Sequence, residues 1–315
     1  MSYLSGQQIA AADYNGMAQT TTGGNVAFVM GTGSAQYGYG QTTTGIAAVS
    51  ATGTVTATQW AGLVYLINRG LGHQSGSAAQ LATGSNIGIT AGARIAAFAN
   101  VLSAATTINT NAATFNAQGT TVTGSNYVAW ANAGIATSYT NSGFATRTVT
   151  FASADGARYF FNAGGQLNFV ISSVTNIDAT ARTSNIVTLF ATNLGGFSAF
   201  RNTSGGGRTG SGGTLNTNST TIGYRNLTTA YQTLVQVTST TAPYTTDVAN
   251  LLVKSNGVQG THQDLGTIVH FALGLSAPES GGWNDTLTAG VNHRIDVVPP
   301  ETTYLNNSWG TITVA

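Results

Sequence analysis

Apolar side chains in the first third of the chain recur at the spacing of an α-helix. One set occupies positions i, i+3, i+4 and i+7: Trp60, Leu63, Val64 and Ile67. We expect Thr58 to cap the N-terminus of this helix and Gly70 to follow its last turn. A second helix is expected to start near Thr90 and to fade into the threonine-rich run 106–110. This part of the chain is therefore predicted to consist of short helices.

From Thr146 onward the apolar positions alternate with polar ones, as in strands with one buried face. Strands are expected at 148–151, 167–171, 234–238, 251–254, 268–272, 295–298 and 312–314. Helices are expected at 153–161 and 184–193, because a pair of glycines follows each segment. Strands at this spacing, separated by turn residues, indicate a mostly antiparallel sheet packed as a sandwich.

These patterns predict an α+β fold with an N-terminal short-helix region and a C-terminal antiparallel β-sandwich-like domain that carries two or three helices. Residues 1–110 are expected to form a helical N-terminal assembly or attachment region. Residues 111–145 are expected to be a linker with some strand character, because alanine, asparagine, threonine and glycine dominate them. Residues 146–315 are expected to form the β-rich α+β domain.

Charged side chains are scarce, with 10 Lys plus Arg and 9 Asp plus Glu in 315 residues. An ordinary soluble protein has about a quarter of its residues charged. A net charge of +1 provides no cluster of cations for nucleic acid or for an anionic membrane surface, so neither is expected as a partner. Weakly charged surfaces lose little hydration when subunits bury them, and the composition therefore favours self-association.

The composition is typical of durable assemblies outside the cell, yet the start of the sequence lacks the basic and apolar regions of a secretory signal. The chain also has no cysteine, so the fold uses no disulfide bonds. A component of a virus particle reconciles these observations. Such a protein is made in the host cytoplasm without a signal peptide and leaves the cell by lysis, so we expect a virion location.

The glycine-rich segment 205–214 has part of the spacing of a phosphate-binding loop, but Gly213 stands where that loop needs a lysine. We interpret it as a surface loop. His262, Asp264 and His270 match neither the spacing of a helical zinc site nor a loop pattern with a known mechanism. His270 is instead expected to pack in its strand or lie at its rim. The sequence therefore predicts no cofactor and no metal site.

Hydrolysis of a sugar bond needs two carboxylates, and Asp296 and Glu301 are the closest pair among strand-like residues. Asp296 comes just before the Pro299-Pro300 corner, so the two residues of this pair are expected to lie at a turn. Asp155 and Arg158 have the spacing of a structural helix pair. We expect no enzymatic activity.

Three aromatic residues near the C-terminus are candidates for a subunit interface or for glycan binding: Trp283, Tyr304 and Trp309. They lie in surroundings rich in glycine and asparagine. Tryptophan and tyrosine can stack on sugar rings, and they are equally typical anchors of protein interfaces.

Residues 148–169 resemble a stretch found in structural proteins of tailed bacteriophages, cyanophages among them. The resemblance is carried by a strand that leads into the turn Arg158-Tyr159-Phe160-Phe161-Asn162-Ala163-Gly164-Gly165, followed by a second strand. Residues 301–314 also resemble the C-terminal ends of those proteins. The motif itself has a physical rationale: its glycines let the backbone leave the helix, and its aromatic rings provide an apolar anchor.

This resemblance implies a non-enzymatic virion structural protein, present in multiple copies in the neck, collar or tail region as a ring or as fibre-like copies. The partners that it implies are copies of this chain and other virion proteins, and it carries over no catalytic residue. The alternative is a receptor- or glycan-binding tail-fibre module, whose partner would be a host surface glycan.

Overall fold

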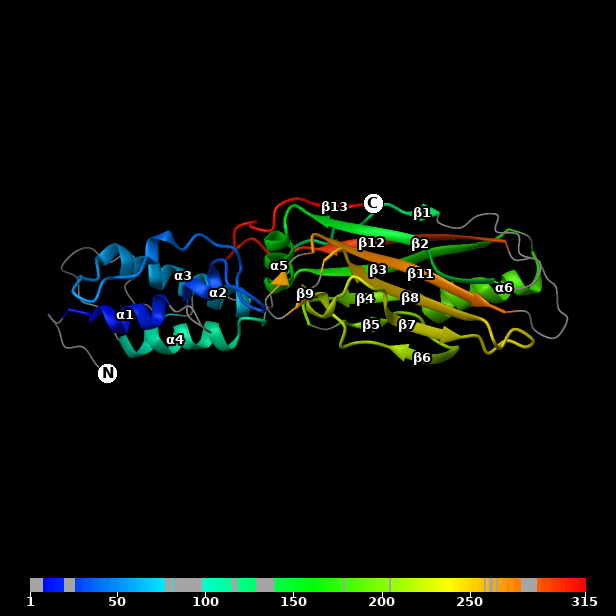
Figure 1. Ribbon diagram of the computed structural model, residues 1–315, viewed down its shortest axis with the longest axis horizontal. Coiled ribbons are helices and arrows are strands. Elements are labelled where there is room, and N and C mark those ends of the chain that lie inside the picture. The colour runs from blue at the N-terminus through cyan, green and yellow to red at the C-terminus, as the bar shows by residue number, and fades with distance from the viewer. Residues whose placement is uncertain are drawn as a thin grey trace. The chain divides into compact units, whose positions relative to one another are not determined.

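The computed structural model (Figure 1) describes residues 8–19, 26–76, 81, 98–114, 118–128, 139–177, 179–203, 205–257, 259–260, 263–264, 266–278 and 288–315. The expected α+β class is confirmed: the N-terminal region is helical, and two antiparallel sheets make up the β-rich C-terminal part. None of the described helices combines the length and the apolar character that crossing a bilayer requires.

The chain divides into two compact units that are not continuous in sequence. Unit 1 falls within residues 1–120, 155–164 and 299–310, and unit 2 within 121–154, 165–298 and 311–315. Two segments of the expected β-rich domain, 155–164 and 299–310, thus belong to the helical unit. Sequence patterns mark where an element begins and ends, but they do not show which earlier residues a later segment packs against.

Unit 1 is built around the long helix α3, which packs against α2 and α4. The short helix α1 also contacts α2 and α4. The helical elements of unit 1 are α1 (Ala11–Ala18), α2 (Val26–Met30), a 3-10 turn (Thr44–Ile46), α3 (Ala57–Ser75), α4 (Phe98–Thr110) and α5 (Ala154–Asn162).

The N-cap of helix α3 lies two residues before the expected one. Thr56, and not Thr58, is the N-cap: the Gln59 backbone N–H donates to the Thr56 hydroxyl at 3.2 Å, and the Thr56 N–H donates to Gln59 Oε1 at 3.0 Å. This reciprocal pair is a capping box, which satisfies two backbone donors at the helix start.

The expected end of α3 at Gly70 is wrong, because the helix continues to Ser75 and ends at Gly76, whose φ is 71°. Gly70 instead allows close packing: a Cβ there would lie 3.0 Å from the sulfur of Met30. A Cβ on Gly72 would overlap the ring of Tyr304. These two glycines therefore allow neighbouring side chains to pack closely against the helix, and they do not end it.

Helix α4 continues through the threonine-rich run in which the sequence suggested that it would fade. The hydroxyls of Thr106, Thr107 and Thr110 each donate to the carbonyl four residues earlier, at 2.9, 2.9 and 3.0 Å. These local bonds satisfy the hydroxyls and so make the run compatible with a helix. The expected start near Thr90 lies outside the described residues.

Unit 2 contains a five-stranded sheet in the order β1-β12-β3-β4-β5 and a six-stranded sheet in the order β13-β2-β11-β8-β7-β6. All strand pairs are antiparallel. The strands of the first sheet are β1 (Tyr127–Val128), β12 (Ala289–Val298), β3 (Gln166–Asn176), β4 (Gly196–Phe200) and β5 (Gly207–Arg208). Those of the second are β13 (Ile312–Val314), β2 (Tyr139–Phe151), β11 (Ile268–Ala277), β8 (Val248–Ser255), β7 (Gln232–Thr238) and β6 (Thr214–Asn218).

Every strand expected from alternation lies within one of these strands. The stretch 111–145 contains β1 and the first part of β2, which is much longer than the expected strand at 148–151. The glycine-rich segment 205–214 also includes the short strand β5. A two-stranded hairpin pairs β9 (Gln259–Gly260) with β10 (Gln263–Asp264).

The expected helix 184–193 is longer at both ends. Helix α6 (Ala181–Val187) has Thr180 as its N-cap, whose hydroxyl accepts from the Thr183 backbone N–H at 3.2 Å. It runs into a π-helical turn (Thr188–Leu194), and Gly195 ends it with φ 68°. A 3-10 turn (Tyr224–Asn226) follows later in the unit.

Three buried phenylalanines join the two sheets of unit 2. The ring of Phe271 on β11 lies 5.8 Å from that of Phe169 on β3 and 5.5 Å from that of Phe200 on β4, centroid to centroid. All three side chains are at most 1% exposed. Because β11 belongs to one sheet and β3 and β4 to the other, these contacts form the core of a sandwich.

We predict that Phe271→Ala lowers the free energy of unfolding of unit 2 by about 3–5 kcal/mol, because it leaves a cavity between the sheets. Urea unfolding followed by circular dichroism measures this change. The control is Leu215→Ala on the edge strand β6, where the side chain is 43% exposed. An unchanged unfolding midpoint for Phe271→Ala would contradict the sandwich core.

Candidate functional site

Arginine side chains bound to main-chain carbonyl oxygens are the recurring polar feature of the structure. The arginines that make such bonds are Arg69, Arg147, Arg158, Arg182 and Arg208. A guanidinium group can donate several hydrogen bonds at once, so a single side chain can hold a segment of irregular backbone.

In unit 1, side chains of helix α5 form hydrogen bonds with the loop 31–40. Arg158 donates to the carbonyl oxygens of Thr32 and Tyr37. One turn later the amide nitrogen of Asn162 lies within hydrogen-bond distance of three acceptors, one of which it shares with Arg158. These are the carbonyl oxygens of Ala35, Tyr37 and Gly38, at 3.0, 2.9 and 3.3 Å. We call this arrangement of Arg158, Asn162 and loop 31–40 the α5 clamp.

The clamp gives the Arg-Tyr-Phe-Phe-Asn motif a role that the sequence did not reveal. Sequence reasoning assigned the anchoring to the aromatic rings, and Phe160 and Phe161 are indeed fully buried. The polar residues Arg158 and Asn162 are buried as well, at 4% and 1% exposure. Their i, i+4 spacing was the signal available, because it places both on one helix face.

The expected pair of Asp155 and Arg158 is confirmed, with a distance of 2.6 Å between carboxylate oxygen and guanidinium nitrogen. The Asp155 side chain is 61% exposed, whereas that of Arg158 is 4% exposed. Arg158 therefore extends from a surface ion pair into the buried clamp.

A second buried polar cluster of unit 1 joins α3 to segments that come before and after it in the sequence. His73 Nε2 lies 2.9 Å from the Ala163 carbonyl oxygen, which can only accept, so this nitrogen carries the proton. The Tyr39 hydroxyl donates to the Ala112 carbonyl at 2.7 Å and accepts from the Gln74 amide at 3.1 Å. Burial lowers the pKa of His73 to about 4 and raises that of Tyr39, so both stay neutral near pH 7.

Unit 1 also has a surface pocket of about 270 Å³ beside Arg69. The guanidinium nitrogens of Arg69 donate to Asn306 Oδ1 at 3.1 Å, to Gln41 Oε1 at 3.3 Å and to the carbonyl of Tyr304. The Tyr65 ring stands at the pocket with 52% of the residue exposed, and its centroid lies 5.5 Å from Arg69 Cζ. A cation and an aromatic ring thus share one concave surface.

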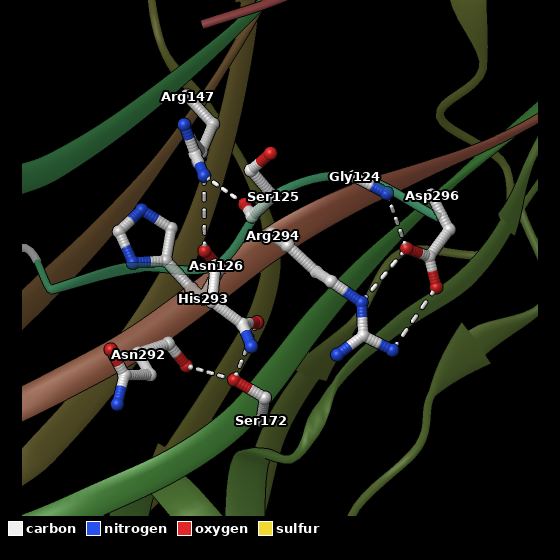
Figure 2. A network of polar contacts seen from close by, with 9 residues as sticks. All are labelled: Gly124, Ser125, Asn126, Arg147, Ser172, Asn292, His293, Arg294 and Asp296. Carbon is white, nitrogen blue, oxygen red and sulfur yellow. Dashed lines mark hydrogen bonds and ion pairs between the residues drawn. The ribbon is translucent and has the colours of Figure 1, made fainter. Parts of the chain in front are cut away.

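In unit 2, a network of polar contacts fixes residues 124–126 along β12 (Figure 2). Arg147 donates to the carbonyls of Ser125 and His293. The Gly124 N–H donates to Asp296 Oδ1 at 3.0 Å, and Arg294 Nε donates to the same oxygen at 2.9 Å. The Asp296 carboxylate thus joins the backbone at Gly124 to the side chain of Arg294.

The same network extends to the surface through Ser172. Its hydroxyl lies 2.9 Å from Asn126 Oδ1 and 3.2 Å from the Asn292 carbonyl oxygen (Figure 2). The neighbouring Tyr127 is 52% exposed, and its ring centroid lies 5.1 Å from Arg147 Cζ. These contacts order the surface around β1.

His293 lies in the interior of unit 2 and is 0% exposed. Its ring stacks on Phe169 at 5.5 Å with an interplanar angle of 26°. Burial lowers the pKa of His293 to about 4, and the charge of Arg147 acts in the same direction. The residue is therefore neutral near pH 7 and part of the packed core.

A buried ion pair links α6 to the residue that precedes β8 in unit 2. Arg182 and Asp247 are 2% and 0% exposed, and their charged groups lie 3.7 Å apart. Asn185 donates to Asp247 Oδ2 at 3.0 Å. Burial raises the pKa of Asp247 to about 6, in spite of the opposing effect of Arg182. No sequence pattern pointed to this pair, because its members lie far apart in the chain.

The aromatic candidates from the sequence fall in different environments. Trp283 lies outside the described residues. Trp309 is 3% exposed in the core of unit 1, so its ring is closed to a sugar. Tyr304 is half-buried, and its ring covers Gly72. Among the described residues, the exposed aromatic side chains that sequence reasoning missed are Tyr65, Tyr127 and Tyr231, because none lies in a motif.

The remaining candidates are engaged locally or lie outside the described residues. His262 and the side chain of Asp264 lie outside them. His270 is half-buried on β11, and its pKa is lowered by burial and by the charge of Lys254. Within the described ranges, no group of three or more His, Asp or Glu residues could hold a metal ion. Asp296 is held by Arg294, and Glu301 accepts from the Thr303 hydroxyl.

Comparisons with known proteins add nothing to these observations: no family model, curated protein or solved structure matches the chain.

We predict that Asn162→Ala destabilises unit 1 by about 1–3 kcal/mol, because it removes a buried donor from several carbonyls of loop 31–40. Chemical denaturation measures the loss. Asn100→Ala on the exposed surface of α4 is the matched control, and it should be neutral or slightly stabilising. Equal stabilities of the two variants would contradict the α5 clamp.

We also predict that unit 1 loses stability as pH falls from about 6.5 to about 4. His73 has an ordinary pKa of 6.5 when unfolded and about 4 when folded, so the unfolded state binds the proton first. The stability that depends on a neutral His73 is fully present above pH 6.5. Its loss at low pH lowers the free energy of unfolding by at most about 3 kcal/mol.

The variant His73→Gln keeps a donor near Ala163 but does not titrate. Its unfolding free energy, measured at a series of pH values, should fall less than that of the wild type over this window. The difference between the two proteins isolates His73 from the other titrating groups. Parallel curves for the two proteins would contradict the assignment.

Proposed function

We propose that this chain is a non-enzymatic structural protein of a tailed bacteriophage virion, present in multiple copies in the neck, collar or tail region. The proposal rests on the resemblance of residues 148–169 and 301–314 to such proteins and on the way in which the chain uses its charges. Its partners are copies of itself and other virion proteins.

The observation that carries the proposal is that several charged side chains are buried and form bonds inside the fold. Five charged residues of the described chain are buried, namely Arg147, Arg158, Arg182, Asp247 and Asp296. Each of the three arginines binds main-chain carbonyls. In a chain with so few charges, this use leaves fewer of them for the surface, and neutral surfaces pack against other subunits at low desolvation cost.

Strand β6 adds a surface suited to assembly. It is the edge of the six-stranded sheet, and its sequence Thr-Leu-Asn-Thr-Asn contains no charge and no proline. Soluble proteins usually protect such edges with charges, proline or bulges, because open backbone groups pair with other strands. β6 has one irregularity in its register, between Leu215 and Thr217, and otherwise none of these protections.

The second candidate function is a receptor- or glycan-binding tail-fibre module. The observation that favours it is the pocket beside Arg69 and Tyr65, which places an exposed aromatic ring next to a cation. The two functions are compatible, since a particle component can also bind a ligand.

We predict that quantitative mass spectrometry of purified particles finds this chain in multiple copies per virion. Electron microscopy of the same particles should then locate it, with sixfold or twelvefold placement for a neck or collar and threefold placement for a fibre. Absence from purified particles, together with a monomeric purified chain, would contradict the proposal.

The contribution of β6 is tested on the purified chain. Leu215→Lys places a charge on the open edge and should weaken self-association in sedimentation experiments. The matched control is Val122→Lys, which changes a residue that is 61% exposed outside this edge. Equal effects of both substitutions would remove β6 from the assembly surface.

A further inference from the structure

The pocket beside Arg69 is built from three separate segments of unit 1. Helix α3 contributes Tyr65, Leu66 and Arg69, the turn after loop 31–40 contributes Gly45, and the C-terminal segment contributes Asn306. The pocket volume of about 270 Å³ suits one small ligand rather than a macromolecular surface.

Among the described residues, no carboxylate forms an ion pair with Arg69. Its bonds go to the hydroxyl of Tyr65, the side-chain oxygens of Gln41 and Asn306 and a main-chain carbonyl, which are all neutral. In the same described part of the chain, Arg158, Arg182 and Arg294 each pair with a carboxylate, and Arg69 does not. A half-buried guanidinium with no carboxylate beside it in the described chain favours an anion, and its planar geometry matches that of a carboxylate.

The rest of the pocket is suited to the body of a sugar. The exposed ring of Tyr65 provides a flat apolar wall, and the buried Leu66 also lines the pocket, at 4% exposure. Asn306 supplies an amide that can bind hydroxyl groups. A pyranose ring presents an apolar face and a polar rim, which match this combination of an aromatic wall and hydrogen-bonding groups.

We propose that this pocket binds a carboxylated monosaccharide unit, such as a uronic acid of a surface polysaccharide. The carboxylate binds Arg69, the ring stacks on Tyr65, and the hydroxyls bind Asn306. This proposal names the ligand class of the second candidate function, on which it rests, and it does not depend on the structural role. Loss of sugar binding would leave the particle assignment untouched, and absence from particles would leave the pocket untouched.

Gly45 provides a substitution that blocks the pocket without disturbing the fold. A Cβ added to Gly45 has no heavy atom within 4 Å, so a larger side chain there projects into open space beside the pocket. Gly16 on α1 offers the matched control, because a Cβ there also meets nothing within 4 Å. Gly45→Leu and Gly16→Leu therefore differ in their position relative to the pocket.

The experiment titrates the full-length chain with glucuronate, galacturonate and uncharged galactose, followed by saturation-transfer NMR and calorimetry. We expect the two uronates to bind and galactose to bind at least about tenfold more weakly, because it lacks the charge-assisted bond. Gly45→Leu and Tyr65→Ala should abolish uronate binding, Arg69→Gln should weaken it about tenfold or more, and Gly16→Leu should leave it unchanged.

Circular dichroism of each variant establishes that unit 1 is folded, which matters for Arg69→Gln because Arg69 also holds the Tyr304 carbonyl. Absence of uronate binding to the wild-type chain would overturn the proposal. So would equal binding of galactose, or uronate binding that survives in Gly45→Leu. A change of oligomeric state in Gly45→Leu with no loss of uronate binding would identify a subunit contact instead.

Discussion

The hydrogen bond from a buried arginine to a main-chain carbonyl is the interaction on which this structure depends. Loop 31–40, residues 124–126 and the C-terminal segment around Tyr304 are irregular backbone, and their carbonyls cannot be satisfied by a helix or a sheet. A guanidinium group satisfies several acceptors at once. The chain has no cysteine, so these bonds take the place that disulfides occupy in many extracellular proteins.

This use of arginine connects the composition to the proposed role. Few charges are present, and several of them are buried as cross-links within a unit. The surface that remains relies on threonine, asparagine, serine and glycine for its hydration, and such a surface can be covered by a neighbouring subunit with little electrostatic cost. Arg69 also binds a main-chain carbonyl, but it is half-buried and borders a pocket.

Sequence patterns predicted the fold class and the strands because both depend on local periodicity: the alternation around Leu167 and Phe169 is visible in a short window. Other features depend on partners that lie far away in the chain. Gly70 looked like a helix end, but it faces Met30 and permits close packing. The α5 clamp and the Arg69 pocket escaped notice for the same reason, because residues such as Asn162 and Asn306 gain their roles only through long-range contacts.

Charged side chains of this chain act inside the fold rather than across its surface. The dependence of the unfolding free energy on salt concentration tests this most directly. Raising NaCl from about 0.01 M to about 1 M shortens the Debye length from about 30 Å to about 3 Å, which screens exposed charges but hardly affects buried ones. Urea unfolding across this range should therefore show a change in free energy of less than about 0.5 kcal/mol. A decrease of more than about 2 kcal/mol would contradict the account, because it would mean that exposed ion pairs hold the fold together.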